Sequence, residues 1–302
     1  MSRHGHKTTL LVAITLLLGL SVSAEIQRDR VYPESAPVDD GLLYFRSGDV
    51  LQKVVVGYDA LLADVYWMRA LQHYGYYRLH QDAPGRYQLL YPLLDLTTTL
   101  DPNFGVAYRF GAIFLAEPDP GGAGRPDLAV QLLEKGVRAT PQKWQYYHDI
   151  GFVYYWHLND YRHAADWFNR GGAIPGSPWW LRTYAAVMLT RGGDRQASRA
   201  MWSNMLQAAD NAWVRTSAQL RLTQLDALDQ IDELSRASDE FNRRRGRPPE
   251  SWDELIKAGL LGGVPLDPTG TPYDLNFHTG GVNVSSQSKL YPLPTEPAPG
   301  QR

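Results

Sequence analysis

The chain has eight histidines, the side chains best suited to proton transfer and metal binding near neutral pH. His148, His157 and His163 lie close together along the sequence, and Asp149 follows His148 directly. A metal site on one helix face needs two histidines four positions apart, as in H-x3-H or HExxH, and neither motif occurs. We therefore expect histidines of the surface or of a groove, and no metal site is predicted.

The sequence also lacks the motifs of other common classes of catalytic site. The absence of cysteine excludes thiol nucleophiles, disulfides, iron–sulfur clusters and cysteine-type zinc sites. The sequence has no G-x-S-x-G nucleophile motif, no phosphate-binding P-loop and no G-x-G-x-x-G fingerprint. The formal net charge of −2 gives no general attraction to nucleic acid or anionic lipid. These features predict a non-enzymatic protein without a cofactor and without a nucleic-acid partner.

Arginines form one basic cluster, residues 243–245 with Arg247. Such a cluster could bind lipid phosphates or an acidic partner. More often a run of this kind is the solvated C-terminal end of a helix, where positive charge is favoured by the helix dipole. We prefer the second interpretation.

The N-terminus has the features of an export signal. Arg3 and Lys7 supply a basic start, residues 10–20 are largely apolar, and Val22-Ser23-Ala24 offers small residues for cleavage. The apolar stretch is about 15 residues long, short of the ~20 that a spanning helix needs. Residues 1–24 are therefore predicted to be a cleaved signal peptide or a short retained membrane anchor.

Either outcome places the rest of the chain in the periplasm or elsewhere outside the cytoplasm. If the segment is retained, residues 8–24 would anchor the protein to the inner membrane. Residues 25–41 are polar and contain two prolines, which predicts a linker. From residue 42 to residue 245 apolar side chains recur every three or four positions and strict alternation is scarce, which predicts helices.

Within this helical region one spacing recurs: small–x3–large–x2–small, followed by a proline. The copies are Ala129, Leu133, Gly136 and Pro141; Ala164, Phe168, Gly171 and Pro175; and, more loosely, Leu90, Leu94, Thr97 and Pro102. A small–x2–aromatic pair precedes each copy: Gly111/Phe114, Gly151/Tyr154 and Ala63/Tyr66. Two helices that cross closely need a small side chain at the crossing and a large one beside it. A proline ends such a unit because it cannot extend the second helix.

This pattern resembles the tetratricopeptide repeat, whose period of 34 residues separates Pro141 from Pro175. A generic helical array of another period is the alternative. The resemblance implies an all-α fold, a helical solenoid with a small irregular C-terminal module. It divides the helical region into units at about 56–102, 103–141, 142–175 and 176–209, with a cap at 210–245. A long insertion, residues 75–86, is expected between the two helices of the first unit.

The segment after the cap, residues 246–288, is predicted to be the small module. Its pattern Gly-x-Pro…Trp-Asp-Glu-Leu…Gly-Leu-Leu…Pro-x-Asp-Pro-x-Gly-x-Pro-Tyr resembles the C-terminal segment of type II secretion pseudopilins. In that family the loop helps to bind calcium. Here Asp267 and Asp274 are its only acids, few for an ion that takes six to eight oxygens. Residues 289–302 are rich in proline, and we expect a disordered tail.

The repeat resemblance also implies a partner-binding groove along the first helices of the units. Carried onto this register, the groove residues are Trp67, Tyr108, His148, Phe152, Tyr155, Trp179 and Arg182. Aromatic side chains beside a histidine and one cation suit a peptide with apolar side chains. The alternative for each aromatic is that it faces a neighbouring helix.

The sequence therefore favours an exported, non-enzymatic scaffold that binds a protein partner in the bacterial cell envelope, for example in a secretion or pilus-like assembly. A small-molecule or glycan-binding protein that uses an aromatic groove is the alternative. Affinity capture of a protein partner would support the scaffold. A melting temperature that rises with a sugar or another small ligand would support the alternative.

Overall fold

The computed structural model describes residues 17, 19–23, 27, 57–81 and 86–296. The described chain is mostly helical, which confirms the predicted all-α fold. Most of the predicted export signal and linker lies outside the described residues. Nowhere in these ranges does a helix have the length and apolar character needed to cross a membrane.

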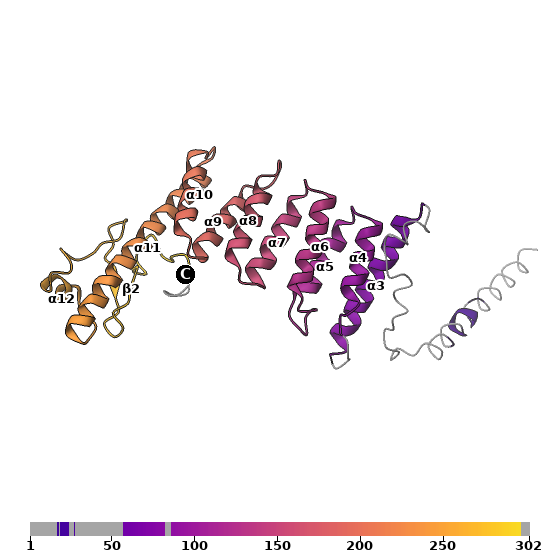
Figure 1. Ribbon diagram of the computed structural model, residues 1–302, viewed down its shortest axis with the longest axis horizontal. Coiled ribbons are helices and arrows are strands. Elements are labelled where there is room, and N and C mark those ends of the chain that lie inside the picture. The colour runs from indigo at the N-terminus through magenta and orange to yellow at the C-terminus, as the bar shows by residue number, and fades with distance from the viewer. Residues whose placement is uncertain (1–16, 18, 24–26, 28–56, 82–85, 297–302) are drawn as a thin grey trace, which may run out of the picture.

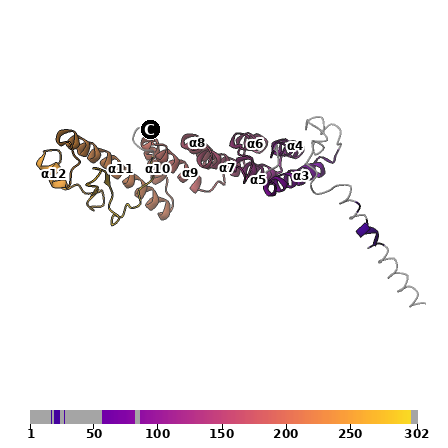
Figure 2. The ribbon, with the colours of Figure 1, turned by 90° about the horizontal axis from the view of Figure 1, so that it is seen from below.

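The helices follow one another side by side along an elongated molecule (Figure 1), and each packs against the next in sequence. Seen from below, α4, α6 and α8 form one layer while α3, α5 and α7 form the other (Figure 2). The helices of this array are α3 (Asp59–Leu79), α4 (Leu90–Leu100), α5 (Gly105–Ala116), α6 (Pro126–Ala139), α7 (Trp144–Trp156), α8 (Tyr161–Gly172), α9 (Trp180–Arg191) and α10 (Arg195–Gln207).

Glycines lie where these helices cross most closely, as the small-residue spacing predicts. A Cβ atom added to Gly151 on α7 would meet the Phe168 ring of α8 at 2.7 Å. One added to Gly111 on α5 would meet Leu94 of α4 at 2.8 Å. Both distances are shorter than a carbon–carbon contact allows, so only glycine permits these helices to approach so closely.

Polar side chains fix several helix starts. Asp160 and Asp194 accept hydrogen bonds from backbone amides three residues later, at the first turns of α8 and α10. Asn211 does the same for α11 (Ala212–Arg245). Gly246 then ends α11 in the left-handed conformation, with φ of 72°.

The expected insertion after Gly75 is shorter than the sequence suggested. Helix α3 continues through Gly75 to Leu79, because aromatic packing stabilises its last turns. Tyr77 is buried there, and the hydroxyl of Tyr74 donates to the carbonyl of Gly121 at 2.8 Å. These contacts tie the end of α3 to the loop between α5 and α6.

The C-terminal module lies against the second half of α11 (Figure 1). It consists of a short helix, α12 (Trp252–Lys257), and two antiparallel two-residue strands, β1 (Asp274–Leu275) and β2 (Val282–Asn283). Tyr273 and Val282 are buried against Ala227 and Leu234 of α11. Helix α11, the predicted cap, packs against the module and α10, with Leu225, Leu228 and Leu234 buried.

The expectation of a disordered tail from residue 289 is wrong for residues 289–296. Leu290 is buried in the apolar cluster of the module, and Leu293 packs beside it. Glu296 forms an ion pair with Arg195 of α10. Alternating leucine and proline suggested an unpacked chain, but the leucines find an apolar surface on α11 that local composition does not reveal.

Candidate functional site

A groove of about 310 Å³ lies between α5 and α7, the first helices of the second and third helix pairs. We call it the α5–α7 groove. Its walls are mainly apolar, and the side chains that form them are Phe110, Ala112, Ile113, Ala116, Phe152 and Val153. A cavity of this size and character is suited to apolar side chains of a ligand.

The largest of these side chains remain open to solvent. Phe110 and Ile113 are each 51% exposed on α5, and Phe152 is 43% exposed on α7. Their neighbour Gly111 lies at the crossing with α4, so helical periodicity turns Phe110 and Ile113 away from that crossing. Apolar side chains gathered and left open in this way commonly mark an interaction surface.

One end of the groove has a fixed polar rim. The guanidinium of Arg109 donates to the carboxylate of Asp149, with Nε–Oδ2 at 2.5 Å and Nη2–Oδ1 at 3.2 Å. This hydrogen bond raises the pKa of Arg109. The ring nitrogen Nδ1 of His148 lies 2.9 Å from Asp149 Oδ1, so the same carboxylate also orients the imidazole. The rim is therefore built from satisfied, paired charges.

His157 and Glu117 form the opposite end. Burial lowers the pKa of His157, and the nearby carboxylate of Glu117 offsets part of this effect. The imidazole is therefore largely neutral at pH 7, and it adds little charge to the groove. Only two of the seven groove residues predicted from sequence, His148 and Phe152, line this groove.

Tyr108 was predicted to line the groove, and this is wrong. It is completely buried, its ring centroid lies 5.3 Å from that of Tyr146 on α7, and its hydroxyl donates to the Thr98 carbonyl of α4. Burial accordingly raises the pKa of Tyr108 to about 12. The position faces outward in the assumed register, but in this pair it is covered by the neighbouring α4 and α7.

The remaining predicted residues do not line the groove, although the Tyr155 ring lies 6.2 Å from that of Phe152. Trp67 is half-buried, with its ring stacked 6.3 Å from that of Phe114. The hydroxyl of Tyr155 accepts a hydrogen bond from Arg191, and Arg182 donates to the carbonyl of Gly172. None of these three lines the α5–α7 groove.

Trp179 forms a second exposed feature, at the start of α9. It is 48% exposed, and its ring centroid lies 4.3 Å from that of Trp213, which is 57% exposed on α11. We call this the tryptophan pair. The sequence placed Trp179 in one continuous groove with Phe152, whereas the structure separates the two features.

Most residues that line the groove were not predicted from the sequence, among them Arg109, Phe110, Ile113, Asp149 and His157. A usable signal was present in α5. Phe110 and Ile113 are large and apolar, they are three positions apart, and they flank residues that the helix crossing requires to be small. The side chains next to a small crossing residue must project to the open face of the helix.

Metal ligands do not gather in the part of the chain that the structure describes, where no group of three histidine or acidic residues could hold an ion. The carboxylate of Asp267 instead accepts hydrogen bonds from Thr269, Thr271 and Ser288. Asp274 lies exposed on β1. The loop that resembles a calcium-binding segment is thus organised here by its own hydrogen bonds.

A scan against protein families found no match to this chain, and neither a search of curated proteins nor a search of solved structures found one.

Proposed function

We propose that the chain is an exported scaffold of the tetratricopeptide-repeat type, which binds a protein partner in the bacterial cell envelope through the α5–α7 groove. The observation that carries this proposal is the half-exposed apolar surface of Phe110, Ile113 and Phe152. Side chains of this kind are the usual anchors of protein interfaces once a partner buries them.

The repeat assignment is supported by the helix pairs themselves. The pairs α5–α6 and α7–α8 repeat the small-residue spacing, and Gly151 meets Phe168 where that spacing puts a large residue. Stacked pairs of this type leave the first helices open along one layer (Figure 2). That layer includes α5 and α7, which form the groove.

The groove suits a helical or extended peptide that inserts apolar side chains. Its charged rim residues, Arg109 and Asp149, already satisfy each other, and His157 is held largely neutral. A ligand that relied on charge would therefore gain little in this groove. The burial of apolar side chains of the ligand would instead contribute binding free energy in proportion to the apolar area buried, about 25 cal/mol for each Å² removed from water.

The proposed location depends on the first 24 residues. Their basic start, apolar run and small-residue cleavage site favour export, with either cleavage or retention as an anchor. N-terminal sequencing of exported material decides between the two. A mature chain that begins at Glu25 supports a cleaved signal, and a chain that begins at Met1 supports an anchored protein.

Affinity capture from envelope membranes, followed by binding measurements on groove variants, tests the function. Phe110→Ala combined with Phe152→Ala should weaken binding of the captured partner at least tenfold, because interface aromatics are each worth ~2 kcal/mol or more. The helical circular dichroism signal should not change, since both side chains are already half-exposed.

The matched control is Arg182→Ala, a position predicted from the sequence to bind the partner that does not line the α5–α7 groove. This control should bind the partner normally. If it loses binding while the Phe110/Phe152 variant binds normally, the α5–α7 groove is not the partner site.

A second candidate, a glycan- or small-molecule-binding protein, is favoured by the tryptophan pair. Two half-exposed indole rings at 4.3 Å offer a broad apolar face with polar N–H edges. A ligand that binds only the folded state raises the melting temperature. A sugar that raises the melting temperature of the wild-type chain but not of Trp179→Ala would support this candidate over the scaffold.

A further inference from the structure

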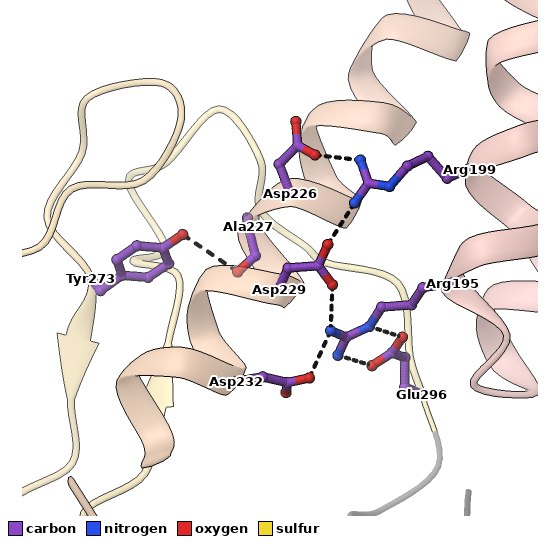
Figure 3. Close-up of polar contacts among 8 residues, drawn as sticks. All are labelled: Arg195, Arg199, Asp226, Ala227, Asp229, Asp232, Tyr273 and Glu296. Atoms are coloured by element: carbon purple, nitrogen blue, oxygen red, sulfur yellow. Dashed lines mark hydrogen bonds and ion pairs between the residues drawn. The ribbon is translucent and has the colours of Figure 1, made fainter. Parts of the chain in front are cut away.

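Residues 289–296 cross from the C-terminal module to α10, and we call them the C-terminal strap. The strap lies on a surface formed by α11 and the start of α10, which we call the strap seat. Figure 3 shows the end of the strap, where Glu296 meets Arg195. The seat is separate from the α5–α7 groove, because none of its residues lines that groove.

The first half of the seat holds the strap by one side chain and two carbonyls. Leu290 is 1% exposed within the apolar cluster that Tyr273 and Val284 share with α11. The side-chain amide of Gln224, itself buried, donates to the carbonyls of Leu290 at 2.8 Å and Pro292 at 3.0 Å. Gln224 thus contacts two backbone carbonyls, one inside the turn that spans residues 288–291 and one just after it.

The second half of the seat is a carboxylate receptor. Arg195 donates through Nε and Nη2 to the two oxygens of Glu296, at 2.6 and 2.5 Å. Its remaining nitrogen, Nη1, donates to Asp229 and Asp232 of α11, each at 2.8 Å (Figure 3). The two aspartates hold the guanidinium so that its free edge points at the strap. A planar, bidentate pairing of this kind is selective for a carboxylate.

Together these contacts define what the seat recognises. They read a buried leucine, a pair of backbone carbonyls beside it, and a glutamate six positions after the leucine. Tyr291, between these contacts, is 58% exposed. The seat therefore has the elements of a peptide-recognition site: backbone hydrogen bonds, a side-chain pocket and one charge that fixes the register.

We propose that the strap seat is a peptide-binding site that the strap occupies from within its own chain. Its external ligand is a peptide of a partner protein that carries the same leucine-to-glutamate spacing and adopts the same turn at the leucine. Residues 289–296 form no helix or strand, and segments without regular secondary structure open more readily than the helices they cover. An external peptide can bind to the seat only when the strap has dissociated from it.

A second copy of the chain fits the seat less well than a separate partner protein. The side chain of Ser288 donates to Asp267, and the backbone amide of Leu290 donates to Ser288 Oγ at 3.0 Å. The start of the strap is thus tied to its own module. To reach the seat of another copy, the strap would have to break these hydrogen bonds as well as leave its own seat.

Fluorescence anisotropy with a labelled synthetic peptide of residues 286–302 tests this proposal on the full-length chain. The wild-type chain should bind the peptide weakly, because the tethered strap competes at a high effective concentration. Leu290→Ala combined with Glu296→Gln in the chain weakens the strap, and this variant should bind the peptide at least tenfold more tightly.

Two peptide variants provide the matched controls on that strap-weakened chain. A Glu296→Gln peptide should bind at least tenfold more weakly, because it cannot pair both oxygens with Arg195. A Tyr291→Ala peptide should bind as well as the unaltered one, since Tyr291 is exposed. Equal binding of all three peptides would overturn the proposal.

Circular dichroism verifies that the strap-weakened chain is folded. If it is not, Glu296→Gln alone replaces it, and no gain in peptide binding over wild type with this milder variant would overturn the proposal. Sedimentation of the wild-type chain should show a monomer at all concentrations. A dimer that excess free peptide dissociates would mean that copies exchange straps, which would overturn the assignment to a separate partner.

Discussion

The helical array and the C-terminal junction are held together by different means. From α3 to α9 the helices cross at small residues and bury apolar side chains, as at Gly151 and Phe168. Between α10, α11 and the strap, two arginines bind four carboxylates, namely Asp226, Asp229, Asp232 and Glu296 (Figure 3). The array depends on complementary shape at its small residues, whereas the junction adds an ion-pair network to the apolar contacts of α10 and α11.

The difference predicts different sensitivities. A close-packed crossing tolerates no added volume and responds little to salt. A partly exposed ion-pair network responds to salt and to loss of a partner, but less to shape. Three predictions test the comparison, in order of decreasing expected effect.

Gly151→Leu should have the largest effect. The added Cβ atom alone would lie 2.7 Å from the Phe168 ring, so α7 and α8 must separate. Overpacking of this kind should cost roughly 3 kcal/mol or more of unfolding free energy. Urea unfolding measures the change. Gly75→Ala is the control, because a Cβ there meets nothing within 4 Å, and it should leave stability equal or higher.

A loss below about half a kcal/mol for Gly151→Leu would mean that the two helices do not depend on this crossing. The array would then be held by its general apolar burial rather than by complementary shape at its glycines.

Acidification should give the next largest effect, and it should act on the array. His73 of α3 is buried, neither ring nitrogen has a hydrogen-bond partner among the described residues, and burial lowers its pKa from 6.5 to about 4. The unfolded chain therefore takes up the proton first as the pH falls. Above pH 6.5 the imidazole is neutral in both states, and the free energy of unfolding has its full value. As the pH falls from 6.5 to 4, the free energy of unfolding decreases by roughly 2–3 kcal/mol.

His73→Phe should remove most of this pH dependence, as followed by urea unfolding at pH 7 and pH 4.5. The C-terminal module provides the contrast. Arg247 lowers the pKa of Glu254 to about 2, so this ion pair persists across the same window. Equal pH dependence in wild type and His73→Phe would place the acid-sensitive group elsewhere.

Arg195→Met should have the smallest effect of the three, about 1–2 kcal/mol of unfolding free energy. It removes the cation that Asp229, Asp232 and Glu296 share, and leaves these carboxylates to repel one another. Added salt should reduce the loss by screening that repulsion. Arg243→Ala with Arg244→Ala is the control, since both arginines are exposed and pair only locally with Glu240.

A double-mutant cycle with Glu296→Gln sharpens this result. Coupling of at least half a kcal/mol between Arg195 and Glu296 would show that the strap contributes to the junction. Coupling close to zero would show that Arg195 stabilises α11 alone and that the strap is not held by its carboxylate.

The array was largely predictable because its determinants are local. The spacing of Gly151 and Ala164 follows from one helix pair, and helical periodicity turns it into a contact. The groove was less predictable. Whether Tyr108 faces solvent or α7 depends on how α5 is rotated against its neighbours, and the repeat register does not fix that rotation.

The junction could not be predicted from spacing at all. Arg195 and Glu296 are 101 positions apart, and neither belongs to a local motif. The proline-rich composition of the tail indicated disorder, because composition reports local preferences and not the surface that Leu290 finds on α11. Long-range polar pairing of this kind becomes visible only when the chain is folded.

Helix α11 gives the molecule a fixed length scale. With 34 residues it extends about 50 Å, and its first half packs on α10 while its second half carries the C-terminal module. Neither proline nor glycine interrupts it, so the usual causes of a sharp kink are absent from α11. Because α11 is long, a tilt of a few degrees where it meets α10 displaces its far end by several ångströms. The ion pairs of Arg195 and Arg199 brace that pivot, so they set the direction in which the module is held.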